Sequence, residues 1–398
     1  MPPLLPARTA ISPVAGTAAD YTYGVEEEYQ LVDLASGALA SRAAEVRRVD
    51  WSGEFTAEFQ ETMLEVGTHP CKSSRELRAD LARLRFQVAT GAAAEGLRIV
   101  PAGLHPFSRW EGHRRTEDAR YQELERAFGR IARDVHTFGM HVHVALPEQV
   151  DRVAVQNAVR PWLPHLLALS ASSPYFEGED TGFDSFRTVL SRRWPTAGVP
   201  PRFADAAEFW RLSAMLVEGG VVRDKHTLYW SMRVHPVYPT VEIRVMDACP
   251  GLDDAVTVAS LCRSVVAAAA EDRLPPAPGT QLSVALEHEL LRVNEWSAAR
   301  NGLDATMLGF GDAPEPLRAS LDRLVEAVAP VAATLGHERL ADEVARIVTL
   351  GNPAARMRAA AADGAGLSEL VAWLVGEGAL GTGLDRRGGQ RGTRGVHP

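Results

Sequence analysis

The sequence of 398 residues predicts a fold in which an antiparallel β-sheet is combined with many helices. Three observations lead to this prediction. Several segments alternate between apolar and polar residues, which is the two-residue period of a strand with one buried face. Other segments repeat apolar residues at the spacing of an amphipathic helix. With 46% hydrophobic and 23% charged residues, the chain can bury a substantial core, in one α/β or α+β unit or in two or three domains.

Helical segments are predicted along most of the chain. The first, Ser73 to Ala94, begins with Ser and Glu at the spacing of a capping box. The others run over 121–133, 153–169 with breaks at Pro161 and Pro164, 206–219, 252–270 and about 281–376. Residues 177–201 are rich in Gly, Pro, Asp and Arg and are predicted to form a long loop, and 274–280 (LPPAPGT) a linker. Among the loop arginines Arg187, Arg192 and Arg193, at least one is expected to clamp a carboxylate or a phosphate.

The alternating segments supply the strands of the predicted sheet. In YTYGVEEEYQLVD, Glu26, Glu28 and Gln30 share one face, whereas Glu27 falls on the apolar face and is expected to pair there with an arginine. The same alternation gives four further sets of neighbours on one face: Glu61, Met63 and Glu65 in ETMLEVGT; His141 and His143 in TFGMHVHVAL; Tyr229, Ser231, Arg233 and His235 in YWSMRVHP; and Glu242, Arg244 and Met246 in TVEIRVMD. A shorter strand is predicted over 96–102.

The polar faces of these strands collect Glu and His, whereas an ordinary solvated face carries mainly Lys, Thr, Ser and mixed charge. If the faces share one concavity, their carboxylates would repel each other unless a divalent cation neutralised them. Oxygen-rich clusters suit Mg²⁺ or Mn²⁺ better than Zn²⁺. The alternatives are a zinc site at His141 and His143, a hydrolase or glycosidase that uses the paired acids, and a solvated sheet face without a site.

Charge and motifs exclude several classes of protein. The formal net charge of −9 argues against binding to nucleic acid. The sequence contains no run of about 18 apolar residues, so no membrane span is predicted. Three scattered cysteines predict a reduced, cytoplasmic setting. A Walker A motif is excluded, because Cys71 precedes Lys72 and Asp224 precedes Lys225, the two lysines of the chain. Neither a G-x-G-x-x-G after a strand nor a G-x-S-x-G is found.

Six segments carry a resemblance in their order along the chain: GVEEEYQLVD, ETMLEVGTHPC, FGMHVHVALP, SPYFEGEDTGFDSFRTVLSRRWPTAGVPP, YWSMRVHPVYPTVEIRVMDACP and NEWSAARNGLDA. Together they resemble the glutamate–cysteine ligase type 2 family of carboxylate–amine ligases. The resemblance implies an α+β, glutamine-synthetase-like fold, in which a curved antiparallel β-sheet forms a half-barrel flanked by helices and holds ATP and divalent metals. It also implies one catalytic domain over 21–380, helical from about 281, between a flexible arm (1–20) and a disordered tail (381–398).

Carried over position by position, the resemblance implies a set of site residues. The metal ligands it implies are Glu26, Glu28, Glu58, Glu65, His141, His143 and Glu242. The nucleotide contacts are Arg244, Arg233 and, as a helper, Glu61, and the catalytic residues are Glu26, Glu65, Arg187 and Arg244. In this assignment Arg187 and Arg233 meet a substrate carboxylate or phosphate.

The activity implied by the resemblance is ATP-dependent amide formation through an acyl phosphate, with Mg²⁺ or Mn²⁺. By default it joins glutamate to L-cysteine, and a homodimer or larger homo-oligomer is expected by analogy. Where the family usually has Asp, Arg and Trp, this chain has Ser231, Val189 and Ser191, so we expect the acid or the amine to differ. A catalytically degenerate, ATP-binding member of the family is the remaining alternative.

Overall fold

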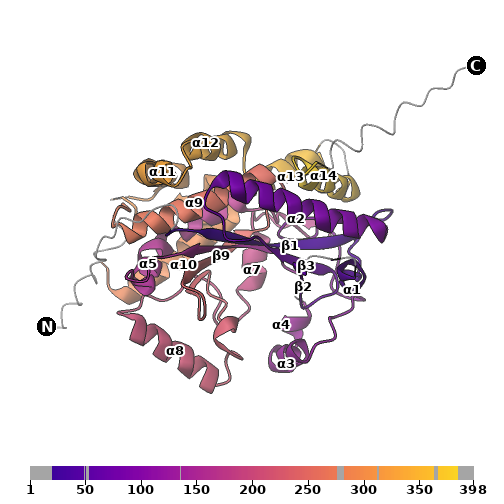
Figure 1. Cartoon of the computed structure of the whole chain (residues 1–398), viewed down its shortest axis with the longest axis horizontal. Helices are drawn as coiled ribbons and strands as arrows, with labels where there is room; N and C mark the ends of the chain where they lie inside the picture. Colours follow the sequence, from indigo (N-terminus) through magenta and orange to yellow (C-terminus); the bar gives the residue numbers. More distant parts are fainter. Residues whose placement is uncertain are drawn as a thin grey trace, which may run out of the picture.

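A seven-stranded antiparallel sheet runs through the centre of the molecule (Figure 1). The structure is a computed structural model and describes residues 20–48, 50, 53–134, 136–275, 282–311, 313–362 and 366–383. Six strands follow one another in the order β2-β3-β1-β5-β9-β8, and β4 also pairs with β1. The strands are β1 (Tyr23–Asp33), β2 (Phe55–Ala57), β3 (Met63–Gly67), β4 (Leu97–Val100), β5 (Gly139–Ala145), β8 (Met232–Val234) and β9 (Thr240–Asp247).

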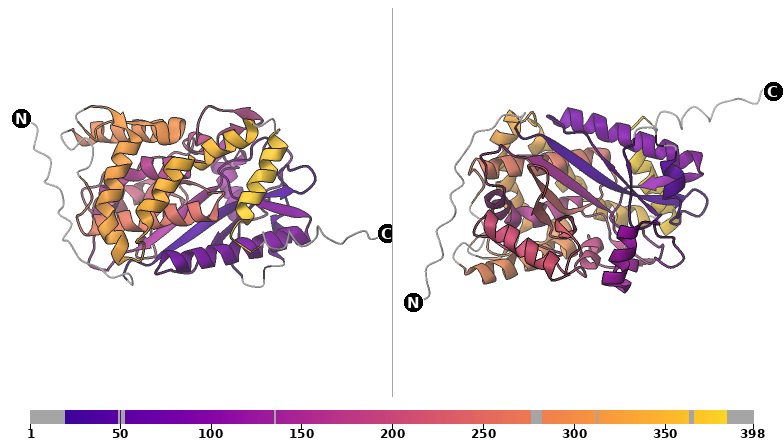
Figure 2. Two further views of the ribbon diagram at one scale, coloured as in Figure 1. Left: turned by 90° about the horizontal axis from the view of Figure 1, so that it is seen from above. Right: turned by 60° about the horizontal axis from the view of Figure 1, so that its bottom comes forward.

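Helices bury the apolar face of this sheet, the upper face in Figure 1. The helices that pack directly on the strands are α2 (Ser74–Ala94), α5 (Arg152–Val159), α6 (Leu163–Ser170), α9 (Leu252–Ala270) and α14 (Leu367–Ala379). A further layer, seen from above in Figure 2, consists of α11 (Leu317–Thr334) and α12 (Leu340–Leu350) over α9, with α13 (Pro353–Ala362) beside α14. Helix α10 (Val284–Asn301) packs on α6.

Smaller elements lie at the polar face and at the edges. The helices are α1 (Ala43–Arg47), α3 (Ala119–Phe128), α4 (Arg130–Arg133), α7 (Phe186–Ser191) and α8 (Ala206–Glu218), of which α3, α4, α7 and α8 lie below the sheet in Figure 1. Two short hairpins pair β6 (Tyr175–Phe176) with β7 (Glu179–Asp180) and β10 (Thr306–Met307) with β11 (Glu315–Pro316). Short 3₁₀ turns occupy Arg160–Trp162, Lys225–Thr227 and Gly302–Asp304.

Local sequence signals explain the long helices. The hydroxyl of Ser73 accepts a hydrogen bond from the backbone N–H of Glu76 at 3.2 Å, which confirms the predicted cap of α2. Helix α9 is buried over nearly its whole circumference, because α2, α6, α11, α12 and β5 surround it. Its run of Ala, Val and Leu is the composition such a central helix requires.

Three predicted segments differ from the structure. The region expected to be helical over about 281–376 contains the β10–β11 hairpin. The helix expected over 121–133 is divided into α3 and α4 at Gly129, whose φ of 54° interrupts the helical backbone. The long loop expected over 177–201 contains α7, whose N-cap is the side chain of Ser185. The predicted arm (1–20), linker (274–280) and tail (381–398) lie outside the described residues, apart from 20, 274–275 and 381–383.

A β-bulge changes the alternation within β9. Met140 of β5 pairs with Met246, but Val142 pairs with Ile243, so two residues of β9 oppose His141. Beyond the bulge the faces exchange, and Met246 packs in the core although the alternation had placed it with Glu242 and Arg244. The prediction for Met246 was therefore wrong, because a strict two-residue period does not survive a bulge.

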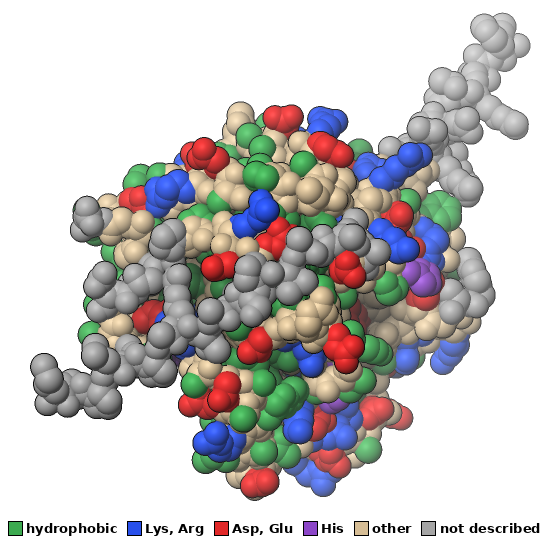
Figure 3. Space-filling view, turned by 60° about the vertical axis from the view of Figure 1, so that its left-hand side comes forward, with side chains coloured by type: hydrophobic (Ala, Val, Ile, Leu, Met, Phe, Trp, Pro, Cys, Tyr) green, Lys and Arg blue, Asp and Glu red, His purple; other side chains and the backbone are tan. Residues whose placement is uncertain are grey.

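On the face drawn in Figure 3, acidic and basic side chains are intermingled rather than gathered by sign. None of the described helices combines the length and apolar character that crossing a bilayer demands.

Candidate active site

A cavity of about 580 Å³ lies on the polar face of the sheet. Its floor is formed by β1, β3, β5, β8 and β9, and its walls by α3, α7, the segment 191–198 and the segment 223–231. Ten of the eleven residues that the sequence singled out line this one cavity: Glu26, Glu28, Glu58, Glu65, His141, His143, Arg187, Arg233, Glu242 and Arg244. The alternation of the strands therefore places the acids and histidines together.

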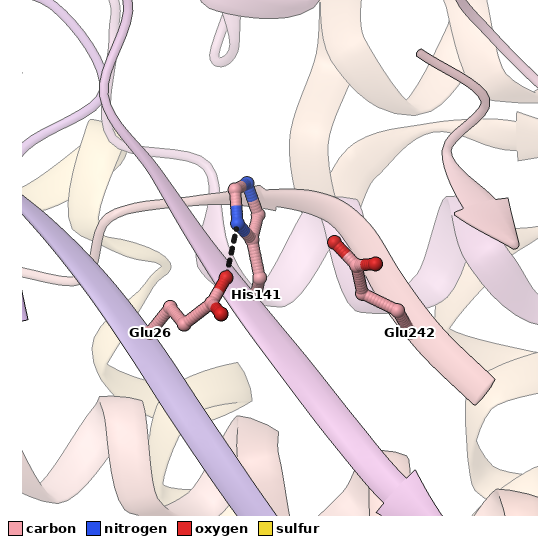
Figure 4. A group of neighbouring side chains, drawn as sticks. All are labelled: Glu26, His141 and Glu242. Carbon is pink, nitrogen blue, oxygen red and sulfur yellow. Dashed lines mark hydrogen bonds and ion pairs between the residues drawn. The ribbon is translucent and has the colours of Figure 1, made fainter. Parts of the chain in front are cut away.

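Three neighbouring strands contribute the first group of the floor (Figure 4). Glu26 of β1, His141 of β5 and Glu242 of β9 each offer one ligand atom, and these atoms lie within 4.8 Å of one another. His141 Nδ1 is 3.1 Å from Glu26 Oε2, and His143 Nε2 is 3.2 Å from Glu26 Oε1. The antiparallel register fixes this arrangement, because Glu26 pairs directly with His141.

A second group shares the same histidine. Ligand atoms of Glu28, Glu65 and His141 also lie within 4.8 Å of one another. Glu28 and Glu65 are direct partners in the register of β1 and β3, and the backbone N–H of Gly139 donates to Glu28 Oε2 at 2.5 Å. His141 therefore stands between two adjacent carboxylate pairs.

Crowding shifts the pKa values of these acids in both directions. Burial alone would raise the pKa of Glu26, but hydrogen bonds and charge from His141 and His143 outweigh it and hold the pKa far below its ordinary value. Burial and the charge of Glu28 raise the pKa of Glu58 to about 8. Burial and the charges of Glu58 and Glu26 raise the pKa of Glu65 well above its ordinary value. A cation among these carboxylates would remove the repulsion.

The donor set fits a hard divalent cation. The two candidate ligand groups share the imidazole of His141, and their other ligand atoms are carboxylate oxygens of Glu26, Glu28, Glu65 and Glu242. Such an oxygen-rich set suits Mg²⁺ or Mn²⁺. Burial and the nearby Arg244 lower the pKa of His141, so its imidazole is neutral and keeps the lone pair that a metal ligand needs.

The arginines of the floor differ in how many of their donors are engaged. Arg233 donates to both oxygens of Glu242, at 2.7 and 3.3 Å, and to the carbonyl oxygens of His226 and Leu228. Arg244 also pairs with Glu242, through Nη1 alone. Arg233 therefore supports Glu242, whereas Arg244 keeps Nη2 and Nε, which have no hydrogen-bond partner among the described residues, for a ligand.

The three arginines of the 177–201 segment separate in the same way. Arg192 pairs with Glu295 at 2.7 Å, and Arg193 with Asp134 at 3.1 Å. Nη1 of Arg187, a residue of α7 that lines the cavity, lies 3.6 Å from Oδ1 of Asp247. Arg187 and Arg192 both line the cavity, and Arg187 differs from Arg192 in having no carboxylate within hydrogen-bond distance.

Glu61 is placed away from the site. Its Oε2 accepts a hydrogen bond from the backbone N–H of Ala44 at 2.7 Å, at the first turn of α1, and the residue does not line the cavity. The alternation had grouped it with Glu65, but β3 begins only at Met63 and Glu61 lies in the preceding turn. The structure therefore places Glu61 outside the lining of the cavity, against the start of α1.

Glu27 takes the buried pairing expected for it. Arg85 of α2 donates to both of its oxygens, at 2.9 and 2.5 Å, and the hydroxyl of Tyr29 donates to Oε2 at 2.6 Å. Arg85 also donates to the carbonyl oxygens of Cys249 and Pro250. The prediction is confirmed, and the pair joins the strand that carries Glu26 and Glu28 to α2 and the end of β9.

Other residues of the walls were not identified as site residues from the sequence. They are Arg120 and Tyr121 of α3, the stacked pair Trp194 and Tyr229 with centroids 4.7 Å apart, and Glu295 of α10. Glu295 is fully buried and accepts a hydrogen bond from Ser231 Oγ at 2.6 Å. Sequence spacing gave no signal for them, since helices and loops far apart in the chain bring them together. Of the three departures from the family pattern, Ser191 and Ser231 line the cavity and Val189 does not.

Comparison with known proteins identifies the family. The sequence profile of glutamate–cysteine ligase family 2 (GCS2) matches residues 22–372. The chain belongs to this family. A relative from Roseiflexus sp. (strain RS-1), assigned provisionally as a glutamate–cysteine ligase 2, is 34% identical over 361 residues, which make up 90% of this chain and 94% of that protein. A relative from Mycolicibacterium vanbaalenii, assigned provisionally as a glutamate–cysteine ligase 2-2, is 37% identical over 85% of this chain and 93% of that protein.

Solved structures share the fold of this GCS2 member at low sequence identity. The bifunctional glutathione synthetase from Pasteurella multocida has a TM-score of 0.69 and 15% identity, over 92% of this chain and 53% of that chain. Glutamate–cysteine ligase from Francisella tularensis, solved in complex with AMP, has a TM-score of 0.63 and 13% identity, over 95% of this chain and 96% of that chain. The predicted α+β, glutamine-synthetase-like fold is confirmed, with an open antiparallel sheet. Family and fold together support a ligase that forms carbon–nitrogen bonds.

Proposed function

We propose that the protein is an ATP-dependent carboxylate–amine ligase that forms an amide through an acyl phosphate. One observation carries this proposal. Glu26, Glu28, Glu65, His141 and Glu242 converge on the floor of one cavity, to which Arg187 and Arg244 also contribute. Phosphoryl transfer relies mainly on positioning and on neutralising the charge of the transferring group, and this arrangement supplies both signs of charge at one place.

The carboxylates would hold Mg²⁺ or Mn²⁺. Glu26, Glu242 and His141 form one candidate ligand set, and Glu28, Glu65 and His141 the other, with Glu58 and His143 beside them. When bound, such ions neutralise charge on the phosphates of ATP and help to orient them. The second oxygen of Glu26 lies against His143, whose pKa is raised because Glu26 and Glu242 outweigh the effect of burial.

The residues of the chain contribute positioning and charge to the two steps. In the first step an oxygen of the substrate carboxylate attacks the γ-phosphorus of ATP, and ADP leaves with the electrons of the broken bond. The amine nitrogen then attacks the acyl carbon, and phosphate leaves as the amide forms. Arg244 and Arg187 line the cavity. Nη2 and Nε of Arg244, and the Nη groups of Arg187, which make only long contacts of 3.4 and 3.5 Å with backbone carbonyls, would meet equatorial phosphoryl oxygens or the substrate carboxylate.

Glutamate and L-cysteine are the substrates that the family name suggests, and we propose that the acid or the amine differs here. Ser191 and Ser231 line the cavity at positions where the family usually carries larger or charged side chains. The hydroxyl of Ser231 donates to the buried Glu295, which Arg192 also contacts, so the carboxylate of Glu295 is already paired within this wall. We further propose a cytoplasmic location, where ATP is available.

The test is ADP release in the presence of ATP and Mg²⁺, measured over a panel of carboxylic acids crossed with a panel of amines. Glu26→Gln removes one metal-binding carboxylate, and Glu289→Gln, at an exposed pair with Arg292 on α10, is the matched control. We expect ADP release that requires an acid and an amine together, a loss of at least about 100-fold in Glu26→Gln and an unchanged rate in Glu289→Gln.

Two results would contradict the proposal. Binding of ATP without ADP release for every pair would favour the degenerate, ATP-binding alternative. Hydrolytic turnover of an amide or a glycoside without nucleotide would favour a metal-dependent hydrolase instead. If glutamate with cysteine proved far better than every other pair, the ligase would stand and the proposed change of substrate would be wrong.

A further inference from the structure

A buried carboxylate lies behind the wall of the cavity without lining it. Asp247 is the last residue of β9, is 0% exposed and follows the bulge of that strand. Its Oδ2 accepts hydrogen bonds from the backbone N–H of Ser172 at 2.9 Å and from the hydroxyl of Ser173 at 2.6 Å. Its Oδ1 accepts one from the hydroxyl of Ser185 at 2.8 Å. All of these donors belong to the segment that leads into α7.

The same serines control where α7 begins. The side chain of Ser185 caps α7 by accepting from the backbone N–H of Thr188 at 3.3 Å. The hydroxyl of Ser173 accepts from the backbone N–H of Arg187 at 3.1 Å. Asp247 therefore determines the orientation of both hydroxyls, since each donates its proton to the carboxylate and offers its lone pairs to α7.

The guanidinium of Arg187 lies close to Asp247 but does not form a hydrogen bond with it. Nη1 lies 3.6 Å from Asp247 Oδ1, beyond hydrogen-bond distance, and 3.4 Å from the carbonyl oxygen of Val245. Nε is buried and has no partner among the described residues. Arg233, by contrast, contacts Glu242 at 2.7 Å. Nη2 lies 3.5 Å from the carbonyl oxygen of Arg244, so both Nη groups of Arg187 make only long contacts and can still donate to an anionic oxygen.

Two glycines leave the space that this arrangement needs. A Cβ at Gly139 would collide with Nη2 of Arg187 and lie 3.3 Å from His141 Nε2. A Cβ at Gly103 would lie 2.6 Å from Asp247 Oδ2. The guanidinium therefore lies against the start of β5, next to His141 and to the backbone N–H that binds Glu28.

We propose that Asp247 is a positioning residue, which fixes α7 and the Arg187 guanidinium beside the acid cluster so that Arg187 meets an anionic oxygen of a substrate. The oxygen belongs to the terminal phosphoryl group of ATP or to the carboxylate of the acid, and the test below separates these two sources. This inference rests on the proposed ligase function. Asp247 itself touches neither substrate nor metal, because it does not line the cavity.

The test compares Arg187→Gln, Asp247→Asn and the double variant in the full-length chain. Calorimetry measures binding of MgADP and of Mg²⁺ with AMP-PNP, which differ in the terminal phosphate, and steady-state kinetics give KM for the acid that supports ADP release. Asp254→Asn is the matched control, since Asp254 is also buried, pairs with Arg346 and Arg356 and does not line the cavity. Thermal melting reports whether each variant folds.

We expect each single variant to lower the affinity for the same ligand by about ten-fold. The affinity of the double variant should be no lower than that of Arg187→Gln alone. A lower affinity for AMP-PNP with an unchanged affinity for ADP would assign the oxygen to the terminal phosphate. A raised KM for the acid alone would assign it to the carboxylate. A merely structural role would lower the melting temperature without this pattern, as expected for Asp254→Asn. If Asp247→Asn does not fold, Ser173→Ala carries the test, with a smaller loss of about three-fold on the same ligand.

Two results would overturn the inference. In one, Asp247→Asn binds every ligand like the wild type while Arg187→Gln does not. In the other, the losses of the two variants add in the double variant. A wild-type protein that binds no nucleotide and releases no ADP would overturn the proposed function, and the inference with it.

Discussion

Replacing Arg85 with methionine is expected to lower the free energy of unfolding by about 3–5 kcal/mol. Arg85 and Glu27 have no exposed side-chain surface, and Arg85 donates to two carboxylate oxygens and two carbonyl oxygens. Methionine fills much of the same volume but leaves the buried Glu27 carboxylate with the hydroxyl of Tyr29 as its remaining donor among those contacts. The cost is that of a buried charge without its counter-ion, and it is a large part of the ~5–15 kcal/mol that stabilises a typical domain.

The assay is urea unfolding followed by tryptophan fluorescence at constant pH. Arg83→Met is the matched control on the same helix, because Arg83 forms a partly exposed pair with Glu54 and is expected to cost about 1 kcal/mol or less. The double variant Glu27→Gln/Arg85→Met should lose at least about 2 kcal/mol less than the sum of the two single variants, since it leaves no uncompensated charge. Arg85→Met within about 1 kcal/mol of the wild type, or strictly additive losses, would refute this reasoning.

Three further predictions follow from the described contacts. Millimolar Mg²⁺ should raise the melting temperature of the wild type and of Glu289→Gln, and should raise that of Glu65→Gln much less, because a bound cation stabilises the folded state by mass action. An equal rise in all three proteins would show that the acid cluster is not the cation-binding site. Glu61→Ala should leave nucleotide affinity unchanged and cost about 1 kcal/mol at the start of α1, because it removes the acceptor for the Ala44 N–H; a calorimetric loss of affinity would return Glu61 to the site. Burial lowers the pKa of His165 to about 3, so the neutral imidazole contributes fully to the free energy of unfolding above pH 6.5, its ordinary pKa, and this contribution is lost as the pH falls toward 3. Between pH 6.5 and 5 the free energy of unfolding should therefore fall by about 2 kcal/mol more in the wild type than in His165→Gln. Equal decreases in urea unfolding would contradict this.

The alternation of the strands made most of the acid cluster predictable. Side chains on a strand point to opposite faces in turn, so the positions of Glu26, Glu28, His141 and His143 on the polar side depended only on β1 and β5 being strands. The same rule predicted a buried partner for Glu27. It failed where the backbone departs from a regular strand, at the turn that carries Glu61 and at the bulge before Met246.

The walls of the cavity could not be predicted in the same way. Helix α7 has six residues within a segment rich in Gly, Pro and Arg, and its cap depends on Asp247, 62 positions away along the chain from Ser185. Arg187, Arg192 and Arg193 look alike in the sequence, and only the positions of Asp247, Glu295 and Asp134 distinguish them. One signal was available, since an aspartate at the end of a buried strand needs hydrogen-bond partners and indicates a tertiary network.

Transfer of oxygen from the acid to phosphate tests the central claim most directly. The acid that supports ADP release is labelled with ¹⁸O in its carboxylate, and the phosphate released during turnover is analysed by mass spectrometry. Because the carboxylate oxygen attacks the γ-phosphorus and leaves with it, we expect one ¹⁸O atom in each phosphate released by the wild type, and at least about 100-fold slower release of labelled phosphate by Glu26→Gln. Phosphate without ¹⁸O, formed while the amide accumulates, would contradict an acyl-phosphate ligase at this site.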